Sequence, residues 1–144
     1  MNLLKVARIP AALASLDMTV RQAVALMVEK NVGSVVVSDA KEEVLGIFTE
    51  RDNLTRVTHA GLDPETTRVS DVMTSPVDTV PPDTTVEEAL AQMTASRYRH
   101  LPIVNGNGRI LGIVSIRYLL MRRLSEKQAS LEVLEAYVTA GGPG

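Results

Sequence analysis

The sequence predicts a mixed α/β fold made of two copies of one unit, followed by a long C-terminal helix. The first observation is a repeat: residues of the first half recur 66 positions later without a gap. The second is the apolar spacing within each copy, which changes between the period of a helix and the short runs of a buried strand. The third is an apolar stripe that continues beyond the end of the second copy.

The repeat is clearest where residues 46–52 (GIFTERD) match residues 112–118 (GIVSIRY). Identical pairs extend along the same diagonal, at Val6/Val72, Pro10/Pro76, Asp17/Asp83, Thr19/Thr85, Ala23/Ala89, Met27/Met93, Leu45/Leu111 and Leu54/Leu120. So many identities on one ungapped diagonal indicate a tandem repeat. One position breaks the symmetry, because the first copy has Asp52 where the second has Tyr118. This difference is the main functional clue.

The repeat suggests boundaries at residues 1–62 for the first copy, 63–124 for the second and 125–144 for a helical extension with a flexible tail. A unit of about 60 residues buries only about 60% of its unfolded surface and is marginally stable alone. Two copies packed face to face would share one core, which a hydrophobic content of 45% can fill.

The composition argues against several classes of function. The chain has no cysteine, which rules out disulfides and thiolate chemistry and is compatible with a reducing cytoplasm. A net charge of −2 gives no general reason to bind nucleic acid, and no apolar run approaches the roughly 18 residues of a membrane span. Two distant histidines and no ligand-spaced acidic cluster predict no metal site. Because no Ser-His-acid pattern is visible either, the chain is not expected to be an enzyme.

In the first copy, an apolar lead-in over residues 1–16 precedes a helix over about residues 19–30. Thr19 and Gln22 stand at the spacing of a capping box. Short β-branched runs predict strands over residues 32–37 and 44–48. Thr49 is a good N-cap for a second helix that ends near Thr58.

The second copy follows a linker over residues 59–67. It is expected to contain a helical turn over residues 69–73, a helix from Thr84 or Thr85, and strands over 101–104 and 110–115 joined by a tight turn at 105–108. The last helix covers about residues 116–138, with Leu120, Leu124, Leu131, Leu134 and Val138 on an apolar stripe that Lys127 interrupts. That stripe either folds back on its own domain or packs on a second subunit.

Several motifs in this order carry a resemblance. They are residues 72–77 (VMTSPV), 82–90 (PDTTVEEAL), 98–104 (YRHLPIV) and 46–52 (GIFTERD). Together they resemble the CBS domain, named after cystathionine β-synthase, which occurs in tandem pairs called Bateman modules. The resemblance implies two β-α-β-β-α repeats that pack by their sheets around a pseudo-twofold axis and leave two clefts. It also implies a regulatory sensor of an adenosine-containing ligand, such as AMP, ADP, ATP or NAD.

Carried over residue by residue, the resemblance assigns one nucleotide-binding cleft to Thr49, Asp52, Pro76, Val77, Asp78, Arg99 and His100. The Asp52 carboxylate would accept hydrogen bonds from both ribose hydroxyls. Thr49 would stand at a helix N-terminus, whose N–H groups attract anions. Arg99 and His100 would supply positive charge for phosphates.

The second cleft would be built from Pro10, Ala11, Ala12, Gly33, Ser34, Ser115 and Tyr118. It departs from the family pattern, because Tyr118 cannot replace the ribose carboxylate and Gly33-Ser34 stands where the other cleft has Arg99-His100. This cleft is therefore expected to be degenerate: empty, weak or differently specific.

Simpler interpretations stay open at this stage. Asp52 can be a first-turn carboxylate that stabilises a helix, and Arg99 and His100 can be solvated. Arg51 and Arg117 either pair with surface carboxylates or contact a ligand. The expected partners are a second copy of the chain, in a homodimer, and an unknown regulated protein. The alternative function is a structural dimer with vestigial clefts.

Overall fold

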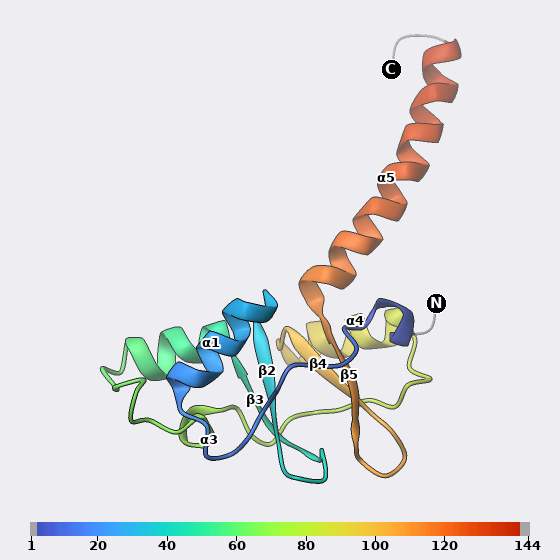
Figure 1. The fold of residues 1–144 in the computed structure, drawn as a ribbon. Coiled ribbons are helices and arrows are strands. Elements are labelled where there is room, and N and C mark those ends of the chain that lie inside the picture. Colours follow the sequence, from blue (N-terminus) through green and yellow to red (C-terminus); the bar gives the residue numbers. More distant parts are fainter. Residues whose placement is uncertain (1–2, 142–144) are drawn as a thin grey trace.

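The computed structural model describes residues 3–141 and contains two α/β units and a long C-terminal helix (Figure 1). The first half consists of η1 (Leu3–Val6), β1 (Leu13–Ala14), α1 (Val20–Lys30), β2 (Ser34–Ser38), β3 (Val44–Thr49), α2 (Glu50–Asp52) and η2 (Asn53–Thr58). The second half consists of α3 (Val69–Val72), α4 (Val86–Ser96), β4 (His100–Val104), β5 (Ile110–Ser115) and α5 (Ile116–Gly141).

The long helices of the two units begin as the sequence predicts. The Thr19 hydroxyl accepts from the Gln22 N–H at 3.2 Å, and the Gln22 side chain accepts from the Thr19 N–H at 2.9 Å, which completes the capping box. Thr85 also caps α4, because its hydroxyl accepts from the Glu88 N–H at 3.1 Å, but the Glu88 carboxylate accepts from the Thr85 hydroxyl at 3.0 Å and not from the Thr85 N–H.

The helix after Thr49 differs from the prediction. After the single turn of α2, the chain continues as the π-helix η2 rather than as an α-helix. The Thr55 hydroxyl donates to the Arg51 carbonyl at 2.8 Å. In an α-helix that carbonyl would accept from the Thr55 N–H, so the side chain competes with the regular backbone ladder.

The two sheets repeat each other's pairing. β2 pairs antiparallel with β3 and parallel with β1, and β4 pairs antiparallel with β5. The equivalent of β1 in the second unit is reduced to one parallel bridge between Val80 and Ile103. The sheets pack through a buried layer made of Ala11, Val36, Ile47 and Ile113. This confirms the predicted association of the two repeats by their sheets.

Each repeat sends its first residues to the other repeat's sheet. Arg8 exchanges two backbone hydrogen bonds with Ile113, at 2.8 and 3.1 Å, and Thr74 does the same with Ile47, at 2.8 and 3.0 Å. Leu3 and Val6 accordingly lie in the core of the second unit, while Val69 and Val72 lie in the core of the first. The packed units therefore exchange segments and differ from the sequence repeats 1–62 and 63–124.

Two glycines permit this exchange. A Cβ atom on Gly46 would lie 2.9 Å from the Thr74 carbonyl oxygen, and one on Gly112 would lie 2.8 Å from the Arg8 carbonyl oxygen. Both contacts are shorter than a carbon and an oxygen tolerate. The glycine at this repeated position therefore allows the crossing segment to reach the sheet.

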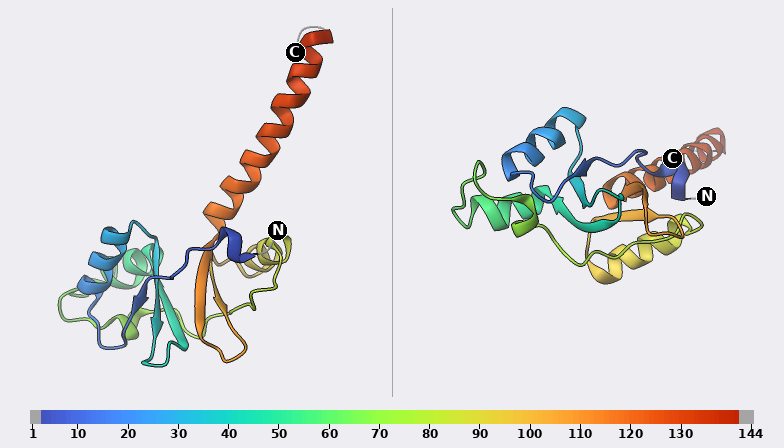
Figure 2. Two further views of the ribbon diagram at one scale, coloured as in Figure 1. Left: turned by 45° about the vertical axis from the view of Figure 1, so that its right-hand side comes forward. Right: turned by 60° about the horizontal axis from the view of Figure 1, so that its bottom comes forward.

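The helix α5 starts on the second unit and then leaves it. Leu119 is buried, and Arg123 forms an ion pair with Glu87 of α4 at 2.9 Å. Beyond this point α5 projects away from both units, and it does not fold back on its own domain (Figure 1 and the left view of Figure 2). Of the tail predicted at residues 141–144, Gly141 is instead the last residue of α5, and residues 142–144 lie outside the described residues.

Candidate ligand-binding cavity

A cavity of about 970 Å³ lies where the two units meet. Its walls come from the N-terminal segment, the beginnings of β2 and β4, and the junction of β5 with α5. The lining residues are Lys5, Val6, Ala7, Arg8, Ala12, Asn31, Val32, Gly33, Ser34, Glu50, Arg99, His100, Ile113, Ser115, Ile116, Arg117, Tyr118, Leu120, Met121 and Leu124. Binding sites for small molecules typically have volumes of about 300–1,000 Å³.

The charges of this cavity favour an anion. Lys5, Arg8, Arg99 and Arg117 bring four basic side chains to it, and Glu50 is the one acidic residue among its described lining residues. Charges of one sign that gather in a cleft raise the local concentration of a ligand of opposite charge. Guanidinium groups also match phosphate geometry through paired hydrogen bonds.

Repeated backbone contacts hold the cavity walls. The Glu50 N–H donates to the Gly33 carbonyl at 3.0 Å, and the Ile116 N–H donates to the Arg99 carbonyl at 2.8 Å. These two hydrogen bonds occupy equivalent positions in the two repeats. Each fastens the start of a helix to the segment that enters a strand, so the cationic and polar side chains are placed by backbone structure.

Arg8 is held from the opposite wall. Its Nη2 atom donates to the carbonyl of Lys30, the last residue of α1, at 3.0 Å. Its backbone pairs with Ile113 of β5, as described above. A residue of the N-terminal segment thus bridges the first unit's helix and the second unit's strand at the edge of the cavity.

His100 lies beside Gly33 in the cavity wall. The position of a Cβ atom on Gly33 is 3.6 Å from His100 Nε2 and 3.1 Å from Glu50 Oε1. Burial lowers the pKa of His100, and the nearby Arg99 charge lowers it further, whereas Asp52 opposes both effects. The imidazole is therefore held toward its neutral form and can donate one hydrogen bond and accept another.

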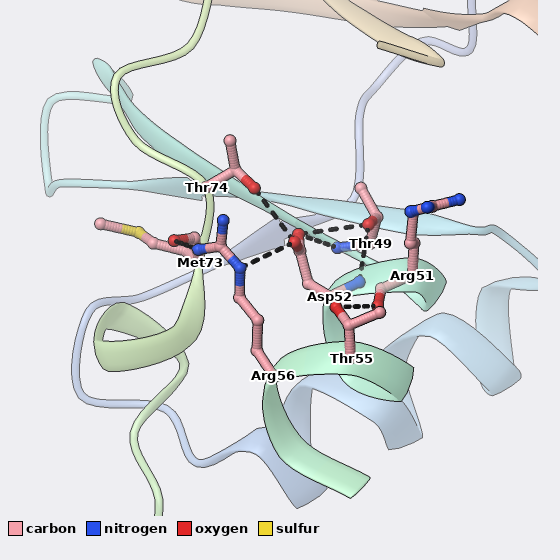
Figure 3. A network of polar contacts seen from close by, with 7 residues as sticks. All are labelled: Thr49, Arg51, Asp52, Thr55, Arg56, Met73 and Thr74. Carbon is pink, nitrogen blue, oxygen red and sulfur yellow. Dashed lines mark hydrogen bonds and ion pairs between the residues drawn. The ribbon is translucent and has the colours of Figure 1, made fainter. Parts of the chain in front are cut away.

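The Asp52 carboxylate takes part in a separate network of hydrogen bonds and an ion pair (Figure 3). Its carboxylate accepts from the Thr49 N–H at 3.0 Å, the Thr49 hydroxyl at 3.1 Å and the Thr74 hydroxyl at 3.0 Å. Arg56 Nε lies 3.6 Å from the same carboxylate, and Arg56 Nη1 donates to the Met73 carbonyl at 3.0 Å. Asp52 is only 7% exposed. The network fastens the N-terminal segment of the second repeat to the first unit.

The residues predicted to form one nucleotide-binding cleft do not all line the same cavity in the structure. Arg99 and His100 line the cavity, but Thr49 and Asp52, predicted to share their cleft, do not. Of the other residues of that set, Pro76 and Asp78 are exposed and Val77 packs against the layer between the sheets. Asp78 lies near Tyr98, whose pKa is raised chiefly by burial and also by the Asp78 charge.

Most of the cleft predicted to be degenerate lines the cavity. Ala12, Gly33, Ser34, Ser115 and Tyr118 all contribute, whereas Pro10 is exposed and Ala11 is buried between the sheets. The prediction thus named this cleft's residues but separated them from Arg99 and His100.

Sequence reasoning missed Lys5, Arg8 and Glu50 as lining residues, and it left Arg117 undecided. A signal for Arg8 exists in the repeat itself. Arg8 is equivalent to Thr74, and Thr74 contacts Asp52. Because Tyr118 is equivalent to Asp52, the repeat offset places Arg8 beside the second cleft.

The fold and the cavity together define a class of protein: a tandem α/β module with a ligand-sized cavity between its repeats. A family model described as "CBS domain" matches the chain twice, over residues 6–52 and 69–125. The chain belongs to the CBS-domain family.

Relatives of known sequence support this assignment. The mitochondrial CBS domain-containing protein CBSX3 of Arabidopsis thaliana is 38% identical over 129 residues, which cover 87% of this chain and 62% of that protein. Protein MK0525 of Methanopyrus kandleri is 42% identical over 94 residues, which cover 65% of this chain and 48% of that protein. The chain thus spans less than two thirds of the length of these relatives.

Solved structures share the fold over most of the chain. A CBS-domain protein of Burkholderia ambifaria with a proposed role in signal transduction has a TM-score of 0.77 at 30% identity, covering 87% of this chain and 95% of its own. The hexameric CBS-CP12 protein of bloom-forming cyanobacteria has a TM-score of 0.78 at 28% identity, covering 99% of this chain and 88% of its own. Within residues 3–141, no helix combines the length and the apolar character needed to cross a membrane.

Proposed function

We propose that this chain is a sensor without catalytic activity that binds an adenosine-containing phosphate compound in the cavity between its repeats. Paired CBS domains are regulatory modules in related proteins, and one relative that contains them is an inosine-5'-monophosphate dehydrogenase of Methanocaldococcus jannaschii. The observation that carries the proposal is the convergence of Lys5, Arg8, Arg99 and Arg117 on one cavity of about 970 Å³.

The lining suggests where each part of such a ligand binds. The four basic side chains suit its phosphates. Tyr118, half exposed at the cavity, offers an aromatic face on which a purine can stack. Ser34, Ser115 and His100 offer polar contacts for ribose. We infer that phosphates supply most of the affinity, so ATP and ADP bind more tightly than AMP.

Isothermal titration calorimetry with adenosine, AMP, ADP, ATP and NAD tests this function. The proposal predicts at least one dissociation constant below about 1 mM, with the affinity rising as phosphates are added. If none of the phosphorylated compounds binds below that concentration, or if adenosine alone binds as tightly as ATP, the proposal is wrong.

Ribose binding by Thr49 and Asp52, beside Pro76, Val77 and Asp78, is a second proposed location. It requires the ligand to replace Thr74 and Arg56 at the Asp52 carboxylate. The open cavity needs no such rearrangement, and we therefore place the ligand there.

A structural role is the alternative function, and a separate observation favours it. Large apolar side chains are exposed on α5, among them Leu120, Met121 and Leu124. In this alternative the chain works as a homodimer whose cavity binds nothing. Self-association itself is compatible with both functions, and the related CBS-CP12 protein is hexameric. The calorimetric panel separates the two, because only the sensor binds a nucleotide.

A further inference from the structure

Glu50 brings a carboxylate to a cavity whose other charged lining residues, among those described, are basic. It is the first residue of α2, and its N–H donates to the Gly33 carbonyl at 3.0 Å, which fixes its backbone at the cavity wall. No residue that the structure describes donates a hydrogen bond to this carboxylate or forms an ion pair with it. Its two oxygens can therefore accept hydrogen bonds from a bound molecule.

Gly33 leaves the space in which this carboxylate lies. The position of a Cβ atom on Gly33 is 3.1 Å from Glu50 Oε1 and 3.6 Å from His100 Nε2. A side chain at residue 33 would therefore crowd the carboxylate. The second repeat has Arg99 at the position equivalent to Gly33 and Ile116 at the position equivalent to Glu50. The glycine and the carboxylate thus occur together in the first repeat, and the second repeat has neither.

The Glu50 carboxylate suits a ribose better than a phosphate. A carboxylate only accepts hydrogen bonds, and the neighbouring 2′- and 3′-hydroxyls of ribose are two donors that can meet its two oxygens. Phosphate oxygens are themselves acceptors, and their negative charge is repelled by a carboxylate. His100 lies beside Gly33, and Ser34 follows it in the chain, so polar groups suited to a ribose adjoin Glu50.

We propose that the Glu50 carboxylate binds the 2′- and 3′-hydroxyls of the ligand's ribose in the cavity between the repeats. The inference rests on the proposed function and deepens it, because it names the group that distinguishes a ribonucleotide from a deoxyribonucleotide. Tyr118 of the second repeat stands where the first has Asp52, and it brings no carboxylate to this cavity. Glu50 of the first repeat supplies one from the opposite wall.

Calorimetric titration of ATP, 2′-deoxy-ATP and 3′-deoxy-ATP into the full-length wild type and Glu50→Ala tests this assignment. The wild type is expected to bind ATP about tenfold or more tightly than either deoxy compound, since each lacks one hydrogen bond to a charged acceptor. Glu50→Ala is expected to bind all three with similar affinities. The ratio of affinities is the measured quantity, because a general change in the charge of the cavity affects the three triphosphates alike.

Glu65→Ala is the matched control, since Glu65 is exposed and does not line the cavity. It is expected to keep the preference of the wild type for ATP. Glu50 is exposed as well, so both variants are expected to fold, which circular dichroism checks.

The outcomes separate this assignment from the proposed function. If the wild type binds no ATP, the proposed function fails and the assignment fails with it. If ATP binds but the wild type has no preference for it over the deoxy compounds, or Glu50→Ala keeps that preference, only the assignment is wrong. Inosine triphosphate lacks the amino group of adenine. A Glu50→Ala variant that changes only the ratio between ATP and inosine triphosphate would place the carboxylate at the base and overturn the assignment.

Discussion

At the scale of single residues, the Asp52 carboxylate stabilises both the start of a helix and the contact between the two repeats. It accepts from the Thr49 N–H and hydroxyl at the start of α2, and from Thr74 in the N-terminal segment of the second repeat. Without the carboxylate, these partly buried donors lose a charged acceptor, and such hydrogen bonds contribute roughly 1.5–3 kcal/mol each. We expect Asp52→Ala to lower the free energy of unfolding by about 2–3 kcal/mol in urea denaturation.

The exposed Asp83 provides the control for that measurement. Asp83→Ala removes the same charge from the surface, where substitutions usually change stability by less than about 0.5 kcal/mol. If the two variants are equally stable, the network around Asp52 does not hold the N-terminal segment of the second repeat.

His100 makes stability depend on pH in a defined direction. Burial and Arg99 lower its pKa below the ordinary value of 6.5. Above pH 6.5 the imidazole is neutral in both the folded and the unfolded chain, so it adds no pH dependence. As the pH falls below 6.5, the unfolded chain binds the proton more readily, and the free energy of unfolding decreases by at most about 1.4 kcal/mol per pH unit.

The measurement compares wild-type protein with His100→Gln in urea at pH 7.5 and pH 5.5. We expect the wild type to lose more stability between these pH values than the variant. Equal losses would show that the folded chain does not disfavour protonated His100.

At the scale of secondary structure, the crossing of each N-terminal segment onto the other sheet depends on a repeated glycine. A Cβ atom on Gly46 would lie 2.9 Å from the Thr74 carbonyl oxygen. We therefore expect Gly46→Ala to push the segment away and to destabilise the fold by about 1–3 kcal/mol, as overpacking does. Thermal denaturation measures the loss.

Gly106 supplies the matched control for Gly46. It lies in the turn between β4 and β5, and nothing lies within 4 Å of the position of its Cβ atom. Gly106→Ala is expected to leave the melting temperature nearly unchanged. If both alanine variants have the same melting temperature, the close approach at Gly46 is not important for the fold.

Most secondary structure could be predicted from local signals. Thr19, Gln22 and Thr85 mark helix starts, and the β-branched runs mark the strands. The π-helix η2 could not, because the Thr49 cap and the residues after it carry the signals of an ordinary α-helix. The segment exchange could not be predicted either, since nothing local to Arg8 or Thr74 specifies the sheet that it joins.

At the scale of the whole molecule, the repeat predicted two clefts and the Asp52/Tyr118 difference predicted that they are unlike. Which cleft is open depends on tertiary contacts that the sequence does not reveal. Thr74 and Arg56 occupy the carboxylate of Asp52. Near Tyr118, the Arg8 side chain instead donates a hydrogen bond to the Lys30 carbonyl at the edge of the cavity. The cavity of about 970 Å³ lies on the side where Tyr118 replaces the carboxylate, a loss interpreted from the sequence as degeneration.

Titration of ATP into wild-type protein, Arg99→Ala and Arg21→Ala by calorimetry tests the central claim that this cavity binds an adenosine phosphate. Arg99 lines the cavity, and Arg21 is an exposed arginine of α1 outside it. A charge-assisted hydrogen bond contributes roughly 1.5–3 kcal/mol, so Arg99→Ala should weaken binding about tenfold or more. Arg21→Ala should bind as the wild type does. Binding that is unchanged in Arg99→Ala, or weakened equally in both variants, would contradict the account.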